Sequence, residues 1–297
     1  MFRSESYFMR FARGLRMEKI AWALRRLHCP VPRNALVLEV GSGGSPYARA
    51  NVLLDAYEVT RERHWTPLVA DRPTVLGFVE NLPFRDGAFD FVIASHVLEH
   101  SPDPERFIAE LQRVARAGYI ETPDAFMERV NPYHDHRLEV TVRENRLIVR
   151  KKADWYVDPE LVELYEQRAK PWVASEAIPN HPFDFHVRYY WFNRIDYEIL
   201  NSHVDAAWEA PKTSAASQPT GRSLRQRLVS GIRFLLSQRV RNSRIDLVSL
   251  MRCPVCKGEN LRSEESSLVC AGCGTVHPVR DGGIPDMISG AVPPVVD

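Results

Sequence analysis

The 297-residue sequence lacks any apolar run close to the roughly 20 residues that a membrane-spanning helix needs. It also lacks the apolar core of a secretory signal, because the longest apolar stretch near its N-terminus covers only residues 20–24. A net charge of only +1 argues against a protein that binds polyanions over its whole surface. These absences predict a folded, cytoplasmic protein without a transmembrane segment.

Cysteine is also scarce, and four of the five cysteines form two C-x-x-C pairs with 13 residues between them. The pairs are Cys253 with Cys256 and Cys270 with Cys273. Each pair is expected to fold into a turn that points two thiolates inward, and four thiolates form the tetrahedral set that structural zinc prefers. Such a set has no open position, so we expect structural Zn(2+) and no catalytic metal here. A ribbon that folds without metal is the alternative.

Glycine is concentrated in one short loop. Residues 36–40 form an apolar run with β-branched members, typical of a buried parallel strand, and Gly41 to Gly44 follow directly. Small residues let the backbone turn sharply and let a ligand lie against bare amides. A second strand is expected at residues 51–54 and ends at Asp55, whose carboxylate is placed to accept both hydroxyls of a ribose. A plain turn is the alternative.

The segments that follow alternate between strand and helix patterns. Strands are predicted at residues 74–79, 90–95 and 119–123, and a helix is predicted to begin at residue 104 and to end at Gly118. Residues 137–151 alternate apolar and polar side chains around Glu144 and Asn145, which indicates a hairpin. The fold class predicted is therefore α/β, with a doubly wound parallel sheet that ends in an antiparallel hairpin.

Taken together, the runs E-V-G-S-G-G, L-P-F and F-D-F-V-I-A-S-H-V-L-E-H resemble the class I S-adenosylmethionine (SAM) methyltransferases over residues 34–155. The nearest group is the small-molecule one that includes ubiquinone- and biotin-pathway enzymes. The resemblance implies a Rossmann-like fold with S-adenosyl-L-methionine as cofactor. The cofactor-binding residues that it implies are Glu39, Gly41, Ser42, Gly43, Gly44, Asp55, Val79, Glu80, Ser95 and His96.

The sequence departs from that family where an acid commonly binds the adenine, because Phe78 stands there and leaves the contact to an amide near Val79 or to Glu80. His96 and His100 follow the most apolar strand and are the candidate catalytic residues, since imidazole titrates near neutral pH. Lining the cleft (His96) and capping a helix (His100) are their alternative roles. Glu99 is expected near the transferable methyl group.

Two further histidines, His134 and His136, follow the fifth strand and are further candidates for the pocket. An N-P-P-Y-like turn is absent after the fourth strand, where this chain has S-H-V-L-E-H. That absence disfavours methylation of a base or glutamine nitrogen of the kind associated with such a turn.

Residues 247–288 resemble the small zinc-ribbon protein that activates tRNA, rRNA and release-factor methyltransferases. In that family the ribbon donates a strand to its catalytic partner and covers apolar surface. The resemblance therefore implies an intramolecular contact between the ribbon and the catalytic core of this chain.

Five regions are predicted along the chain. They are an N-terminal amphipathic helix (1–33), a SAM-binding core (34–152), an aromatic-rich cap (153–209), a linker with an Arg-rich helix (210–246) and a zinc ribbon (247–290). The first helix is expected to cover the cofactor cleft or to lie on an anionic surface. The Arg-rich helix is expected to meet RNA or anionic lipid, or to be a solvated spacer.

The main functional prediction is a SAM-dependent methyltransferase that acts on a small-molecule, lipid or glycan acceptor. An RNA or translation-factor methyltransferase with a built-in activator is the first alternative, favoured by the ribbon and the Arg-rich helix. A non-catalytic SAM-binding scaffold is the second, because Phe78 replaces the adenine-binding acid.

Overall fold

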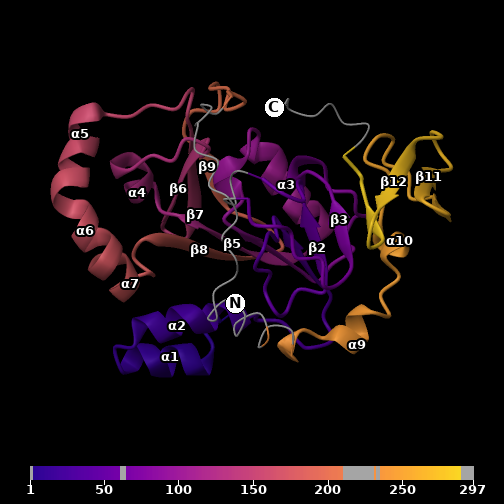
Figure 1. Ribbon diagram of the computed structural model, residues 1–297, viewed down its shortest axis with the longest axis horizontal. Helices are drawn as coiled ribbons and strands as arrows, with labels where there is room; N and C mark the ends of the chain where they lie inside the picture. The colour runs from indigo at the N-terminus through magenta and orange to yellow at the C-terminus, as the bar shows by residue number, and fades with distance from the viewer. Residues whose placement is uncertain (1–2, 61–64, 210–230, 232–234, 289–297) are drawn as a thin grey trace. The chain divides into compact units, whose positions relative to one another are not determined.

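The computed structural model describes residues 3–60, 65–209, 231 and 235–288 (Figure 1). Two compact units divide the chain. One contains residues 1–32, 94–105 and 117–215, and the other contains residues 33–93, 106–116 and 216–297. We call them the N-terminal and the C-terminal unit and describe each by itself. Within the described residues, no helix is long and apolar enough to cross a membrane.

Buried parallel strands form the core of the C-terminal unit. β1 (Val37–Val40) pairs with β2 (Val52–Asp55), and β2 pairs with β3 (Thr74–Leu76), all three fully buried. The six-stranded sheet has the order β3-β2-β1-β4-β5-β8, in which β4 is Phe91–Ser95 and β5 is Ala117–Pro123. The order reverses after β1, as in other doubly wound sheets, which confirms the predicted fold class.

Two predicted boundaries were wrong. The strand expected at residues 74–79 ends at Leu76, and Val79–Asn81 form a 3-10 turn. The helix expected to end at Gly118 is α3 (Pro104–Val114), and Gly118 lies inside β5. Gly118 is opposite Trp191 in the sheet.

The antiparallel strand of the large sheet comes from an unexpected segment. The predicted hairpin forms as β6 (Leu138–Arg143) and β7 (Arg146–Lys151), with left-handed backbone at Glu144 and Asn145. It belongs to a separate three-stranded sheet with β9 (Tyr197–Ile199).

β8 (His186–Phe192) instead pairs antiparallel with β5. The expected cap therefore supplies a core strand, because Val187, Tyr189 and Trp191 alternate along it and are all buried.

The rest of the aromatic region is largely helical. α5 (Pro159–Leu164), α6 (Lys170–Trp172) and α7 (Ile178–Asn180) follow one another as a continuous rod in Figure 1. π-helical turns at Tyr165–Ala169 and Val173–Ala177 join them. Pro171 and Pro179 each remove one helical N–H, which accounts for widened turns in front of them. A shorter helix, α4 (Ala125–Val130), follows β5.

The N-terminal segment is a helical hairpin and not the single amphipathic helix expected in region 1–33. α1 (Tyr7–Gly14) and α2 (Glu18–Leu24) are separated by a turn in which Arg16 has a left-handed backbone (φ 57°), and a 3-10 turn at Arg25–Leu27 continues α2. A residue with positive φ cannot continue a right-handed helix, so the apolar pattern breaks here.

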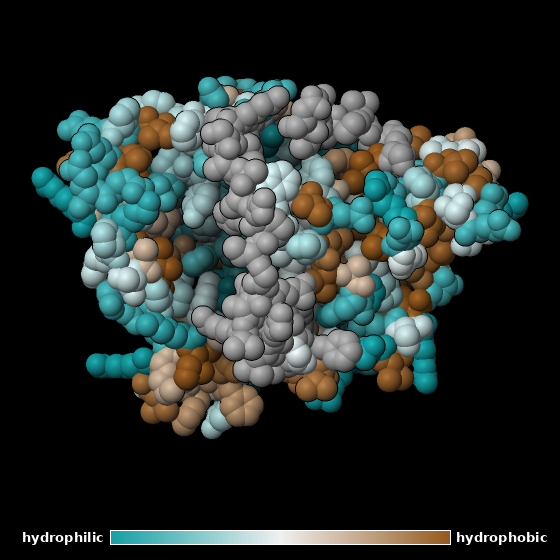
Figure 2. All heavy atoms as spheres, viewed as in Figure 1, coloured by the Kyte–Doolittle hydropathy of each residue, from teal (hydrophilic) through white to brown (hydrophobic). Residues whose placement is uncertain are grey.

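The buried face of this hairpin also differs from the expected one. Met9, Ala12 and Ala21 are buried, whereas most of the larger apolar side chains whose spacing predicts a helix are exposed. The exposed ones are Phe8, Phe11, Leu15, Ile20 and Leu27. Figure 2 shows apolar residues gathered over α1 and α2.

The C-terminal ribbon contains its own four-stranded sheet. Its strands are β10 (Leu261–Glu264), β11 (Ser267–Cys270), β12 (Val276–Arg280) and β13 (Ile284–Pro285), and α10 (Leu247–Leu250) precedes them. The linker and most of the predicted Arg-rich helix lie outside the described residues. Of that helix, α9 (Arg239–Asn242) is described.

The ribbon extends the edge of the large sheet within the C-terminal unit. Asp286, just past β13, forms a parallel bridge with Leu76 of β3, and the Met287 amide donates to the Leu76 carbonyl at 2.9 Å. Met251 bridges to Phe84, and both side chains are fully buried. The ribbon thus pairs with β3 through its backbone and packs an apolar side chain against the core. This is the intramolecular contact that the resemblance implied.

Candidate functional site

The glycine loop after β1 adopts a backbone that requires glycine. Gly41 and Gly43 have φ angles of 61° and 55°. The Ser42 amide donates to the Leu54 carbonyl at 3.1 Å, and the Gly43 amide donates to Oδ2 of Asp55 at 2.9 Å. The loop is therefore fastened to the end of β2.

Two buried carboxylates brace this loop. Asp55 also accepts from the Tyr57 amide through Oδ1 at 3.0 Å, and Glu39 accepts from the Tyr47 amide at 2.7 Å. Burial of both carboxylates indicates that their charge is matched by oriented amides. The contacts to ribose and to the methionine ammonium remain predictions for Asp55 and Glu39.

One hydroxyl in the loop lacks a partner. Ser42 is 4% exposed, and its Oγ has no hydrogen bond within the described residues. Buried polar atoms are nearly always paired, so an orphaned hydroxyl in such a loop points to a ligand. Space is tight beside it, because a Cβ on Gly44 would lie 2.6 Å from Cγ2 of Thr66. Binding of the methionine end of SAM by this loop remains a prediction.

The residues expected to contact the adenine follow β3. Val79 and Glu80 lie in the 3-10 turn, and Phe78 precedes it with an extended backbone. The Phe78 ring packs edge-on against Tyr57, with 6.2 Å between ring centroids. An aromatic wall takes the place of the acid common in the family, and the contacts of Val79 and Glu80 to adenine remain predictions.

The N-terminal unit holds the other predicted residues. His96 follows β4 with a left-handed backbone (φ 58°), a conformation that few non-glycine residues adopt. Its ring nitrogens lie 3.4 Å from Glu99 and 3.4 Å from Glu121. Burial opposes charge on this ring, but hydrogen bonds to Glu121 and Glu99 outweigh burial and raise the pKa of His96 to about 9. His96 is therefore an imidazolium at neutral pH.

Glu121 is the centre of a buried network that the sequence analysis missed. It accepts from Ser95 Oγ at 3.1 Å and from the Tyr119 hydroxyl, and Arg25 binds it with two donors at 2.8 and 3.0 Å. Burial would raise its pKa, but His96 and Arg25 hold the pKa of Glu121 well below its usual value. One feature of the sequence could have revealed this network, since Glu121 is the only acid in the predicted strand at residues 119–123.

A second cluster lies on the same unit, beyond His96. His100 Nδ1 lies 3.1 Å from the Asp135 carbonyl, and its ring meets that of His136 edge-on at 4.7 Å. His136 Nδ1 lies 2.6 Å from Glu128. Burial lowers the pKa of His136, but Glu128 and Glu99 raise it above its usual value. His134, the other candidate, instead packs near Trp155.

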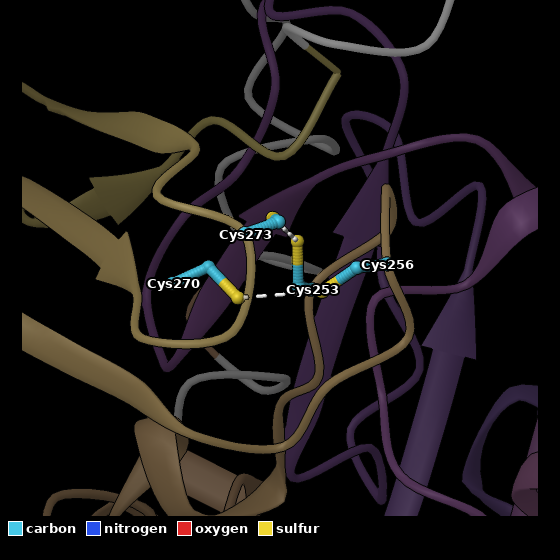
Figure 3. Close-up of side chains that lie close together, drawn as sticks. All are labelled: Cys253, Cys256, Cys270 and Cys273. Atoms are coloured by element: carbon cyan, nitrogen blue, oxygen red, sulfur yellow. Dashed lines mark hydrogen bonds between the residues drawn. The ribbon is translucent and has the colours of Figure 1, made fainter.

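The four predicted metal-ligating cysteines converge in the ribbon (Figure 3). Their sulfur atoms all lie within 4.8 Å of one another, with 3.7 Å between Cys253 and Cys273 and 3.4 Å between Cys256 and Cys270. A tetrahedral zinc site with Zn–S bonds of about 2.3 Å places sulfurs about 3.8 Å apart. The cluster therefore fits a zinc ion.

The described end of the Arg-rich segment forms hydrogen bonds within the protein. Arg241 donates to the backbone carbonyls of Arg33, Asn34 and Ala35 at 2.6 to 2.9 Å. Nearby, Asn242 accepts from the Asn51 amide at 2.8 Å. This described end of the segment anchors β1 and β2, so Arg241 is not offered to an external phosphate.

Comparison with known proteins gives two family matches. Residues 38–120 match the methyltransferase domain family, and residues 244–282 match the Trm112p-like protein family. An uncharacterized methyltransferase of Mycobacterium sp. (strain JLS) is 32% identical over 116 residues, which cover 37% of this chain and 46% of that protein.

The tRNA (carboxymethyluridine(34)-5-O)-methyltransferase alkbh8 of Xenopus tropicalis is 34% identical over 95 residues, which cover 29% of this chain and 14% of that protein. The chain thus spans less than half the length of the curated relatives it matches.

Among solved structures, a complex of the Haloferax volcanii Trm112 methyltransferase activator with a candidate methyltransferase is similar at a TM-score of 0.36. It is 15% identical, and the match covers 63% of this chain and 93% of that one, a likeness too weak to argue from. The two family matches carry the assignment. Residues 38–120 match the methyltransferase domain family and residues 244–282 match the Trm112p-like family, which confirms the resemblance of this chain to a SAM-dependent methyltransferase fused to an activator-like ribbon.

Proposed function

We propose that this chain methylates RNA with SAM as methyl donor and carries its activator domain on the same polypeptide. The observation that carries the proposal is the Trm112p-like domain, whose β13 region pairs with β3 of the methyltransferase sheet. The relative named as a tRNA methyltransferase supports the same acceptor class. Such a fused ribbon needs no separate activator to cover the apolar side chains of Phe84 and Met251.

Each predicted residue has a role in this proposal. SAM supplies an activated methyl group when bound. Glu39, the Gly41–Gly44 loop with Ser42, and Asp55 hold the methionine and ribose parts, and Val79 and Glu80 hold the adenine. Positioning then supplies much of the rate, because methyl transfer is an in-line displacement.

The two candidate catalytic histidines have different chemistry. His96, beside Ser95, is protonated near neutral pH and directs its two ring nitrogens at Glu99 and Glu121, so it presents a positive charge to the acceptor and acts as a base only above its raised pKa of about 9. Nδ1 of His100 lies 3.1 Å from the Asp135 carbonyl, so His100 serves the acceptor through Nε2, either directly or through an ion that Nε2 binds. Both assignments place the acceptor at the carboxyl end of β4.

Acceptor class is tested by incubating the full, zinc-loaded chain with methyl-labelled SAM and separate fractions of total RNA, protein, lipid and small molecules. We expect label in RNA that ribonuclease releases. Label confined to protein would favour a translation factor, and label confined to lipid or small molecules would overturn the RNA proposal.

Gly41→Arg tests the cofactor site. A side chain at a loop position with positive φ blocks the space for SAM, so binding measured by calorimetry should be lost and methyl transfer with it. Gly14→Arg is the matched control, because a Cβ at Gly14 meets nothing within 4 Å. Undiminished SAM binding by folded Gly41→Arg protein would contradict the loop assignment.

A small-molecule acceptor is the second candidate. The S-H-V-L-E-H run after β4, without an N-P-P-Y-like turn, is the observation that favours it. The same labelling experiment separates the two, because a small acceptor would carry label that passes through an ultrafiltration membrane and resists ribonuclease.

A further inference from the structure

Three side chains of the N-terminal unit form a second potential metal-binding cluster, separate from the four cysteines. One ring nitrogen of His100, one of His136 and a carboxylate oxygen of Glu99 all lie within 4.8 Å of one another. His100 and Glu99 are adjacent in the turn after β4, and His136 comes from the loop before β6. Two imidazoles and a carboxylate are a common ligand set for first-row transition metals.

Both histidines have the second hydrogen-bond partner that is typical of metal-binding histidines. Metal-binding histidines almost always direct their second ring nitrogen at a carboxylate or a backbone carbonyl, which fixes the ring. Here Nδ1 of His136 lies 2.6 Å from Glu128, and Nδ1 of His100 lies 3.1 Å from the Asp135 carbonyl. Lys152 also binds Glu128 at 2.7 Å and so fixes that carboxylate. Nε2 of each ring is therefore available to a cation.

Glu99 supplies an independent sign of a ligand. It is 2% exposed, and its Oε2 has no hydrogen bond among the described residues. His96 forms an ion pair with the other oxygen, Oε1, at 3.4 Å. A buried carboxylate oxygen that lacks a hydrogen bond is costly unless it meets a cation.

We propose that Glu99, His100 and His136 bind a divalent first-row transition metal ion, such as Mn²⁺ or Zn²⁺. This site differs in kind from the ribbon cluster, where four thiolates leave no open position. Three protein ligands leave coordination positions for water or for an oxygen atom of a substrate. Glu128 is a positioning residue that orients His136.

Manganese binding to the zinc-loaded full chain tests the site, without SAM or any acceptor. Thiolates prefer zinc, so added Mn²⁺ reports on the nitrogen and oxygen ligands. Electron paramagnetic resonance of free Mn²⁺ should show about one ion bound per chain. Failure of this binding would leave SAM binding unaffected, so it is distinguishable from failure of the proposed methyltransferase activity.

Variants locate the bound ion. Glu99→Gln and His136→Ala should each abolish Mn²⁺ binding, whereas the neighbouring His134→Ala should retain it. Glu128→Gln should weaken binding about 10- to 100-fold, as expected for loss of a positioning carboxylate. If His136→Ala fails to fold, the nearly isosteric Glu99→Gln decides. No bound Mn²⁺ in the wild-type protein, or full binding by Glu99→Gln, would overturn the proposal.

Discussion

The glycine loop and the histidine–carboxylate network are built from side chains at very different separations along the chain. In the loop, Asp55 accepts from Gly43, 12 positions away, and Glu39 accepts from Tyr47, 8 positions away. In the network, Arg25 binds Glu121 across 96 positions. Local contacts leave a pattern in the sequence, whereas contacts over long separations leave only isolated polar residues. The difference predicts which changes act locally and which disturb the fold.

The largest effect is expected from the two cysteine pairs, which also lie within a short stretch of the chain. Cys253→Ser combined with Cys256→Ser removes two of the four thiolates, and structural zinc contributes about 10–16 kcal/mol of apparent binding free energy in small domains. We expect loss of the ribbon zinc and unfolding of β10 to β12, measured by metal analysis and by hydrogen exchange. Cys29→Ser, outside the cluster, should change neither. A ribbon that stays folded without metal would contradict zinc as its stabiliser.

A smaller but global effect is expected from Glu121→Gln in the long-range network. Arg25 would lose its buried partner, and breaking such a pair costs about 3–5 kcal/mol. Urea unfolding at neutral pH should show this loss of stability. Glu198→Gln, an exposed member of a surface pair with Arg146, should stay within about 0.5 kcal/mol of the wild type.

The pH dependence of that variant sharpens the test. The folded-state pKa of Glu121 lies well below its usual value of 4.5, so its contribution is present above pH 4.5 and is lost as the pH falls through the folded value. The wild type should therefore lose stability on the acid side more steeply than Glu121→Gln. Parallel acid profiles would show that the network does not hold the carboxylate charged.

The smallest effect is expected in the loop. Ser42→Ala removes an unpaired buried hydroxyl, so the free energy of unfolding without SAM should stay the same or rise slightly. SAM affinity should fall by about 1 kcal/mol, or about fivefold, measured by calorimetry. Ser263→Ala, exposed on β10, is the control. Unchanged SAM affinity would remove Ser42 from the cofactor site.

Predictions from sequence succeeded where periodicity and turn residues act locally. The hairpin at β6 and β7 formed around Glu144 and Asn145 as expected, and β1, β2 and β4 began within one residue of the predicted starts. The prediction of a single N-terminal helix with its large apolar side chains buried was wrong. Those side chains recur with a helical period, but most of them are exposed. Met9 and Ala12 form the buried face instead.

The edge strand β8 shows the second kind of failure. Buried and less buried side chains alternate along its aromatic run, as in a strand. The sequence analysis nevertheless assigned the nearby hairpin to the edge of the sheet, because its turn residues gave a clearer antiparallel pattern. Which of two strands pairs with β5 depends on packing across long separations, and the sequence does not encode that choice in any short window.

The sequence by itself determined the glycine loop, the two cysteine pairs and the order of β1, β2 and β4, because glycine, paired cysteines and apolar periods act over a few residues. Only the tertiary structure decided that Arg25 neutralises Glu121, that Glu99 meets His100 and His136, and that β3 is the strand that the ribbon meets. Those contacts join distant segments, and charge buried between such segments is stable only once folding has excluded water from around it.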